Sequence, residues 1–242
     1  MEQIQSLLEI REYCAIGEIG IDLYWDKTYL KEQEIVFEEQ LRWAVKMNLP
    51  VAIHTREAFP EVLQCIHNVG NDKLSGVFHS FTGNEKELDA VLELNNFKIG
   101  INGVVTYKNS TLREVLKRTS IDKIVLETDA PYLPPVPYRG KANLPIYIWK
   151  TAEKIAEIFG LSVKETVEIT RNNTLELFKI VNNTGKGDGL LNTKINFLLS
   201  SIIARSKSSI VTVTWCALYI QCNVFFSLSQ IILSIIFNSI IR

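Results

Sequence analysis

Four side chains of the types that bind divalent metal ions recur along the sequence, each at the end of a short apolar run. They are Glu18, His54, His79 and Asp129, in the segments AIGEI, VAIH, GVFH and VLETD. A single histidine in such a place is more often an ordinary partnered residue than a metal ligand. Four such groups in equivalent places favour a metal site, because burying several of them without partners would cost free energy for each.

Such a set can hydrolyse a phosphodiester. Glu18 follows Gly17, which lets the backbone and a metal ion approach closely, and the Glu18 carboxylate could bridge two ions. Two ions held about 3.5–4 Å apart can activate a water molecule and stabilise the leaving oxygen. Asp129 is the candidate catalytic residue, as a ligand, a base, or both in turn. His67 falls on an expected helix away from any strand end, and we interpret it as a surface or packing residue.

The elements that must position these residues follow from the hydropathy pattern. Short apolar runs alternate with amphipathic stretches between residues 12 and 130, which is typical of βα units around a parallel sheet. The expected strands are Cys14–Ile19, Val51–His54, Gly76–His79, Phe97–Ile101 and Lys123–Glu127. The expected helices are Leu30–Met47, Ala58–Asn68, Glu85–Leu94 and Leu112–Arg118. In a parallel barrel the carboxyl ends of the strands converge on one site, which predicts that the four candidate ligands meet there.

A stiff loop and further helices follow the last expected strand. Four prolines, at positions 131, 134, 135 and 137, forbid regular helix. An amphipathic helix is expected over Ile146–Phe159. Ser162 and Glu165 fit a capping box that opens another helix, which a second helix over Thr174–Val181 would extend.

Composition sets the class of protein. The chain of 242 residues, 47% hydrophobic and 22% charged, is long enough for one α/β barrel domain with an appendage. A net charge of -1 gives no general basic field, so a nucleic acid would have to be held locally. Cys14, Cys65, Cys216 and Cys222 lack metal-binding or disulfide spacing, and Met1–Arg11 lacks a secretory pattern. We therefore expect a cytoplasmic protein with reduced thiols.

The composition changes abruptly after Gly185, which divides the chain into an expected domain over residues 1–184 and an apolar extension over residues 185–242. Residues 189–242 contain four basic residues and no acidic ones, and residues 208–241 carry no charge at all. Residues 210–237 are a transmembrane candidate by length. An accidental, aggregation-prone extension is the alternative. Contact with a membrane is expected only through this tail.

The motifs around the four candidate ligands resemble those of the TatD family of metal-dependent deoxyribonucleases. They are GEIGID over residues 17–22, IHTR over 53–56, FHSFTG over 78–83 and ETDAPYL over 127–133, in this order and spacing. The resemblance implies a TIM-type barrel of the amidohydrolase kind. It also implies hydrolysis of DNA, as a single strand or from a strand end, with Mg²⁺ or a similar ion in a two-ion site. Glu18 would bridge the ions, His54 and His79 would be ligands, and Asp129 would be a ligand or catalytic.

The sequence departs from the family pattern at its start. The family's opening strand supplies a His-x-His pair to the first metal, whereas none of the three histidines here is so paired. About three strands precede the GEIG segment in the family, against about a dozen residues here. We therefore expect a partial TIM-type (β/α) barrel lacking about the first three strands, with exposed strand edges. No stable protein partner is expected. A catalytically inactive barrel remnant and a hydrolase of another ester or amide are the alternatives.

Substrate contacts are expected from residues near the strand ends. Arg56 is a candidate phosphate ligand, with an ion pair to Glu57 or another acid as the alternative. Arg139 and Asn143 could also hold a phosphate, although Ala142 and Leu144 stand beside Asn143 where the family has a basic and an acidic residue. Tyr24 and Trp25 could stack on a base. For Trp25 we favour packing within its loop.

Overall fold

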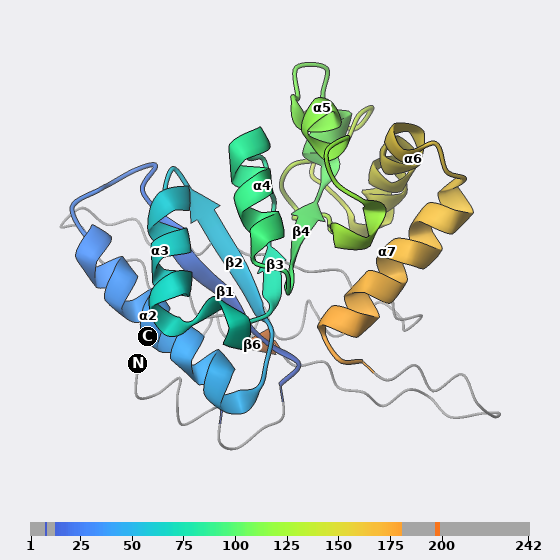
Figure 1. Cartoon of the computed structure of the whole chain (residues 1–242). Coiled ribbons are helices and arrows are strands. Elements are labelled where there is room, and N and C mark those ends of the chain that lie inside the picture. Colours follow the sequence, from blue (N-terminus) through green and yellow to red (C-terminus); the bar gives the residue numbers. More distant parts are fainter. Residues whose placement is uncertain (1–7, 9–12, 181–196, 199–242) are drawn as a thin grey trace, which may run out of the picture.

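The computed structural model describes Leu8, residues 13–180 and residues 197–198. These residues form a parallel sheet of six strands in the order β5-β4-β3-β2-β1-β6 (Figure 1). The strands are β1 (Ala15–Asp22), β2 (Val51–Arg56), β3 (Gly76–Phe78), β4 (Phe97–Ile101), β5 (Ile124–Leu126) and β6 (Phe197–Leu198). The expected α/β fold with a parallel sheet is confirmed. The number of strands that the family places before Glu18 stays a prediction.

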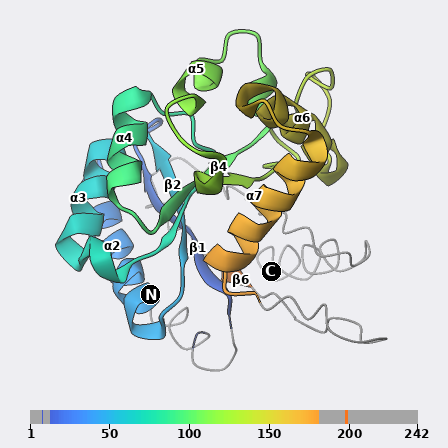
Figure 2. The same cartoon turned by 45° about the vertical axis from the view of Figure 1, so that its right-hand side comes forward.

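Helices connect the strands and cover one face of the sheet. They are α2 (Leu30–Met47), α3 (Phe59–Val69), α4 (Glu85–Glu93), α5 (Leu112–Leu116), α6 (Ile148–Phe159) and α7 (Val163–Leu177). Short 3-10 turns lie at η1 (Asn71–Lys73), η2 (Gly103–Thr106), η3 (Ile121–Lys123) and η4 (Pro145–Tyr147). Helices α2, α3 and α4 lie together on one side, and α6 and α7 lie towards the other end of the sheet, as Figures 1 and 2 show. The expected strands and helices thus lie where the sequence pattern places them, within a few residues at each end.

One expected helix boundary is wrong. The capping box of Ser162 and Glu165 opens α7 as expected. However, α7 continues through Thr174 to Leu177, so no second helix begins at Thr174. The Thr174 hydroxyl donates a hydrogen bond of 2.9 Å to the carbonyl oxygen of Thr170, one turn back. Because this bond is made inside the helix, the threonine does not interrupt it.

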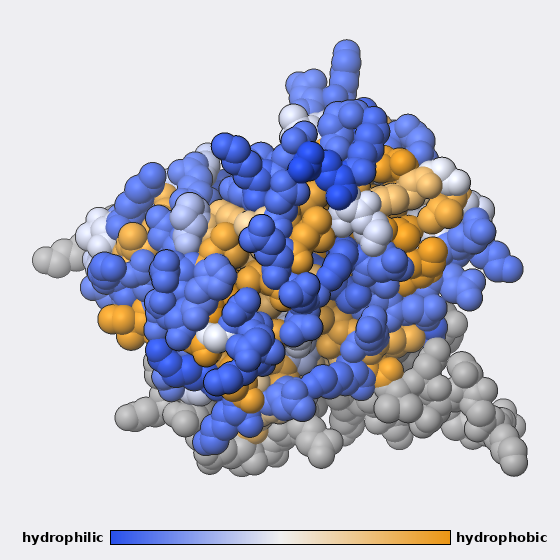
Figure 3. Space-filling view, viewed as in Figure 1, coloured by the Kyte–Doolittle hydropathy of each residue, from blue (hydrophilic) through white to orange (hydrophobic). Residues whose placement is uncertain are grey.

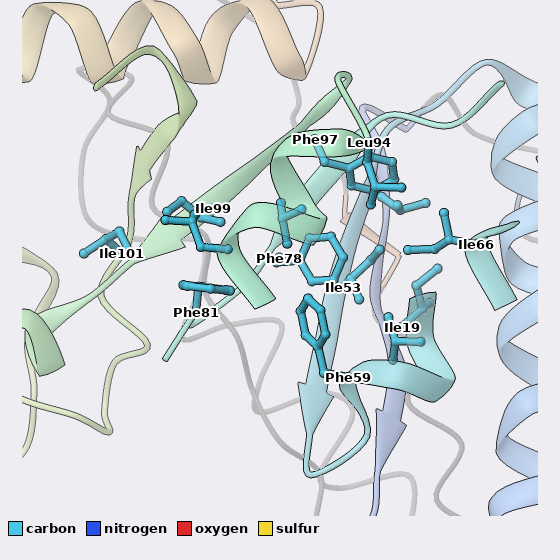
Figure 4. Packing of buried hydrophobic residues seen from close by; sticks show 14 of the residues in the cluster. Ile19, Ile53, Phe59, Ile66, Phe78, Phe81, Leu94, Phe97, Ile99 and Ile101 are labelled. Atoms are coloured by element: carbon cyan, nitrogen blue, oxygen red, sulfur yellow. The ribbon is translucent and has the colours of Figure 1, made fainter. Parts of the chain in front are cut away.

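Side chains alternate between two faces of the sheet. On the helix-covered face, apolar residues of the strands pack against the helices, with Phe59, Phe78 and Phe97 in contact at ring separations of 5.6 and 5.7 Å (Figure 4). The opposite face carries a second, smaller apolar cluster of Ala15, Ala52, Val77, Val125, Leu177 and Phe178. Solvent meets mainly hydrophilic side chains on the outer side of the helices, with apolar residues showing between them (Figure 3). The second face is therefore the one with room for polar groups at the strand ends.

A register shift in β1 turns Glu18 to that second face. Ile16 pairs with Val51 of β2, but Ile19 pairs with Ile53, so β1 has one extra residue between these two pairs. Ile16 and Ile19 both belong to the helix-side core, although they are three positions apart. Because side chains alternate along a regular strand, only an irregularity of this kind reverses the parity. The irregularity includes Glu18.

The tail predictions lie almost wholly outside the described residues. Phe197 and Leu198 form β6, which pairs with Ala15 and Ile16 and so covers part of the β1 edge that we expected to be open. Residues 210–237, the transmembrane candidate, are outside the described part of the chain. Within that part, no helix combines the length and the apolar character that crossing a membrane requires.

Asn173 provides a test of how α7 is attached to the sheet. Its side-chain nitrogen donates to the carbonyl oxygens of Ile121 and Ile124, both at 2.8 Å, and the residue is buried. Asn173→Ala should lower the free energy of unfolding by about 1–3 kcal/mol, because two buried carbonyls lose their partner. Urea denaturation measures the change. The matched control is Asn172→Ala, at the exposed neighbouring position, which should change stability far less. Equal effects of the two substitutions would show that these bonds do not hold α7 in place.

Candidate metal centre

Three of the four candidate ligands meet, although not all at strand ends as expected. Glu18 lies in the middle of β1, which continues to Asp22, His54 lies two residues before the end of β2, and His79 directly follows β3. Glu18, His54 and His79 each offer a ligand atom within 4.8 Å of the other two. The Nδ1 atom of His54 lies 2.8 Å from Oε1 of Glu18, and Nε2 of His79 lies 3.7 Å from the same oxygen. The two imidazole rings are stacked, with centroids 6.3 Å apart. Two imidazoles therefore converge on one carboxylate from neighbouring strands.

Asp129 lies beside this group rather than in it. It follows β5 with a left-handed backbone, at a φ of 57°, and it is buried. Burial raises the pKa of Asp129 to about 6, and the charges of Glu127 and Glu18 add to the rise, while those of His79 and His54 oppose it. The carboxyl group thus interacts electrostatically with both imidazoles, and its pKa lies close to neutral pH.

Unpartnered oxygens show what the site is suited to hold. Oε2 of Glu18 and Oδ1 of Asp129 are buried and have no hydrogen-bond partner. A buried oxygen without a partner costs free energy, unless a cation or a hydrogen-bond donor reaches it. Carboxylate oxygens beside two imidazole nitrogens are ligands for divalent metal ions. Glu18, His54 and His79 therefore fit a metal ion, with the Asp129 carboxyl group beside them.

His54 is held by carboxylates on both ring nitrogens. Nδ1 faces Glu18, and Nε2 lies 3.0 Å from Oδ2 of Asp22, the last residue of β1. Burial alone would lower the pKa of His54, but the bonds to Asp22 and Glu18 outweigh it and raise that pKa to about 9. Burial alone would raise the pKa of Glu18 and of Asp22, but the bonds to His54 and the positive charges nearby outweigh burial and lower both pKa values. His54 is accordingly protonated at neutral pH in this arrangement.

His79 is oriented by Glu127, a residue that the sequence reasoning missed. The Glu127 side chain is fully buried, and its Oε1 lies 3.3 Å from Nδ1 of His79 and accepts a hydrogen bond from the backbone of Ser80. With Nδ1 facing Glu127, Nε2 faces Glu18. Gly100 of β4 makes room for this carboxylate, since a Cβ there would lie 2.3 Å from Oε2 of Glu127.

A signal for Glu127 was present in the sequence. Val125 belongs to the cluster on the second face of the sheet, and Glu127 follows it by two positions, so both side chains leave the same face. Asp22 ends the GEIGID motif, but the sequence alone gives it no role. Its contact with His54 depends on how β1 and β2 pair, with Gly20 opposite His54 and Asp22 opposite Arg56.

The sequence profile described as TatD related DNase matches residues 1–179. The chain belongs to the TatD family. It is 37% identical over 178 residues to the uncharacterized metal-dependent hydrolase YabD of Bacillus subtilis, which covers 73% of this chain and 69% of YabD. It is 34% identical to a protein of Pectobacterium parmentieri named 3'-5' ssDNA/RNA exonuclease TatD, over 74% of this chain and 71% of that protein.

Solved structures agree with this TatD assignment. The chain matches the crystal structure of YjjV, a TatD homologue from Escherichia coli, with a TM-score of 0.68 and 31% identity, over 74% of this chain and 70% of that one. A TatD family hydrolase from Entamoeba histolytica matches with a TM-score of 0.59 and 25% identity, over 68% and 62% of the two chains. The protein is thus a member of a family of metal-dependent hydrolases with an amidohydrolase-like fold.

The candidate phosphate ligands of this TatD family chain have different surroundings. The Arg56 guanidinium lies over the Tyr24 ring, 3.5 Å from its centroid, while Glu57 pairs with Lys27 at 3.9 Å. Trp25 is 79% exposed, so our preference for packing of this residue within its loop is wrong. The loop turns back towards β2 through the Leu23 backbone, which leaves the indole outside the core. His67 is on the surface, as expected.

Arg139 and Asn143 lie in the loop that follows β5. The Arg139 guanidinium lies over the Tyr107 ring, 4.1 Å from its centroid, and Arg139 is exposed. Asn143 is buried, and its side-chain nitrogen donates to the carbonyl oxygens of Thr128 and Tyr132, both at 2.6 Å. These bonds hold the loop that carries Asp129. Arg139 therefore stays a candidate phosphate contact, whereas the Asn143 amide is already used within the loop.

Metal binding should release a proton from His54. A metal ligand must be a neutral imidazole, whereas a pKa of about 9 keeps His54 protonated at pH 7. Affinity for a divalent ion should therefore rise with pH up to about 9 and level off above it. Calorimetric titration at pH 7, in buffers of different protonation enthalpy, should show release of about one proton. Release should vanish at pH 10. Binding without proton release at pH 7 would show that the ion does not replace the proton of His54.

Removing the Glu127 carboxylate should weaken the metal site. Glu127→Gln replaces the acceptor that orients His79 with a neutral amide of the same size, and loss of such a partner costs about 10- to 100-fold in metal affinity. Calorimetric titration with Mn²⁺ measures this. The control is Glu114→Gln, on the exposed surface of α5, which should bind the ion as the parent does. Unchanged affinity in the Glu127 variant would mean that His79 is not oriented by it.

Proposed function

We propose that this chain is a divalent-metal-dependent phosphodiesterase that hydrolyses DNA. The observation that carries the proposal is the convergence of Glu18, His54 and His79 within 4.8 Å, beside a buried carboxyl group whose pKa is about 6. The Pectobacterium relative named as an exonuclease of single-stranded DNA and RNA supports a nucleic-acid substrate with a free strand end. Substrate, polarity and activity of this chain are part of the proposal.

The protein's own residues divide the work. A divalent ion held by Glu18, His54, His79 and Asp129 would supply a Lewis acid that makes a water molecule more acidic and neutralises charge on a phosphoryl oxygen. Asp129 accepts the proton of the attacking water at Oδ1, which is buried and unpartnered. Without an ion the pKa of Asp129 is about 6, so the group is ionised at neutral pH, as a proton acceptor must be.

Positioning falls to the surrounding contacts. Asp22 fixes the His54 ring and Glu127 fixes the His79 ring. Arg56 and Arg139 are the proposed phosphate contacts, each held flat by an aromatic ring, which leaves the guanidinium edge for an anion. Because the net charge of the chain is -1, a polyanion has to be bound by such local cationic contacts.

We propose one ion for the ligands that this chain supplies. Its sequence contains three histidines and no His-x-His pair, so the ligands of the family's first metal are not among them. Mg²⁺ is the ion that the family resemblance favours, whereas two imidazole ligands also suit Mn²⁺ or Zn²⁺. We place the reaction in the cytoplasm, where thiols such as those of Cys14 and Cys65 stay reduced.

Conservative substitutions in the site test the proposal. Glu18→Gln and Asp129→Asn keep the size of each side chain and should lower Mg²⁺-dependent or Mn²⁺-dependent cleavage of a single-stranded oligonucleotide by at least about 100-fold. The loss follows because the first removes a ligand charge and the second a proton acceptor. Gel electrophoresis of end-labelled DNA measures cleavage, with EDTA as the metal-removal control. His67→Ala, on the exposed side of α3, should cut as the parent does.

The outcomes separate three readings. Cleavage by both variants at the parental rate would reject this site. Absence of cleavage by the parent, with one ion bound in calorimetry, would favour a metal-binding but inactive barrel. Hydrolysis of carboxylic esters or amides in place of DNA would keep the site and change the bond.

A further inference from the structure

Three exposed side chains lie where β1 and β2 end. Trp25 is 79% exposed and Tyr24 is 45% exposed. Their rings meet edge to face with centroids 4.7 Å apart, and the Arg56 guanidinium lies 3.5 Å from the centre of the Tyr24 ring and 6.0 Å from that of Trp25. We name Tyr24, Trp25 and Arg56 the aromatic platform. No contact described above for the metal centre uses the indole.

Backbone hydrogen bonds hold the residues that carry the platform. The Tyr24 backbone donates to Oδ1 of Asp22 at 2.9 Å, and the Leu23 backbone donates to the carbonyl oxygen of Arg56 at 2.9 Å. The Leu23 side chain between them is buried. A tryptophan usually buries most of its large apolar surface, as Trp43 does in α2. Trp25 is instead presented to solvent, directly after two residues whose backbones are hydrogen-bonded.

The platform adjoins the metal centre. Asp22, which holds the Tyr24 backbone, also contacts His54 at 3.0 Å. Arg56 follows His54 by two positions in β2, so the two side chains leave the same face, and their Cα atoms are about 7 Å apart along the strand. A group bound on the platform therefore lies near the ion ligands, on the same face of the sheet.

We propose that the aromatic platform is a subsite for an unpaired nucleobase of the DNA strand whose phosphodiester lies at the metal centre. An aromatic face stacks on any base, and Arg56, whose face rests on Tyr24, keeps its edge for the adjoining phosphate. Stacking on Trp25 requires the base face, which a duplex covers with its neighbours. The subsite therefore selects single strands over duplex without reading sequence. This inference rests on the proposed DNA substrate.

Charge distinguishes this occupant from an apolar one. Asp26, Lys27 and Glu57 surround the platform, with Lys27 paired to Glu57 at 3.9 Å and Asp26 bound to the Thr28 backbone. A lipid tail or an apolar protein surface would bury these charges at a cost in free energy. A base with its sugar and phosphate covers the indole and leaves the charges in water.

The test asks whether the Trp25 indole contacts a base of the bound strand. Binding of a fluorescein-labelled oligothymidine to the full chain is measured by fluorescence anisotropy in EDTA, with a second oligonucleotide that is abasic at successive positions. Trp25→Ala should weaken binding of oligothymidine by about tenfold or more. It should have little effect on the abasic oligonucleotide whose gap coincides with the platform. Trp25→Phe should restore most of the affinity, because it restores an aromatic face. Trp149→Ala, another exposed indole at the start of α6, should bind as the parent does.

Three results would overturn the subsite. If Trp25→Ala binds oligothymidine as the parent does while cleavage persists, the base is not held there and the proposed function stands. If the parent binds no single strand and cleaves none, both proposals fail together. Duplex of the same sequence should compete at least about tenfold less well than the single strand, and equal competition would also reject the subsite.

Discussion

The whole arrangement depends on one buried carboxylate that needs compensation. The register shift in β1 places Glu18 on the face of the sheet opposite the helices, where it is 5% exposed and one of its oxygens has no partner. A regular strand would have turned this side chain towards the apolar core, where a carboxylate is costly. His54 and His79, from the next two strands, bring nitrogens to the other oxygen. The fold thus tolerates the buried Glu18 carboxylate on this face because His54 and His79, from the neighbouring strands, contact it.

The charges around Glu18 do not balance without a cation. Glu18, Asp22, Glu127 and Asp129 could carry four negative charges against three positive ones on His54, His79 and Arg56, whose charge acts on Asp22, a deficit of one even with both imidazoles protonated. The raised pKa of His54 follows from its bonds to Asp22 and Glu18, which outweigh burial, whereas the raised pKa of Asp129 comes first from burial, with the charges of Glu127 and Glu18 adding to it. A divalent ion would offset this excess of negative charge. The same excess explains why phosphate contacts must come from outside the ligand group.

The sequence pattern predicted the parallel α/β order and the meeting of three ligands, because both follow from local periodicity and from the rule that strand ends converge. It missed features that depend on pairing between strands. The parity change at Glu18 depends on the register of β1 against β2, and the role of Glu127 depends on the space above Gly100 in a neighbouring strand. The exposure of Trp25 was judged wrongly, since hydropathy favours burying an indole and says nothing of the loop that carries it.

The two arginines show how an acidic centre can still accept a polyanion. Arg56 and Arg139 follow different strands, and each guanidinium lies flat on an aromatic ring, Tyr24 for the first and Tyr107 for the second. A ring under the guanidinium leaves its donors at the edge, and the described part of the chain shows no carboxylate within ion-pair distance of either arginine, although the charge of Arg56 also acts on Asp22. Lys27, by contrast, has Glu57 as its partner. Cations paired with rings rather than acids are therefore the groups that retain charge for phosphates. In a protein whose net charge is -1, such pairing permits attraction at the site without a basic surface elsewhere.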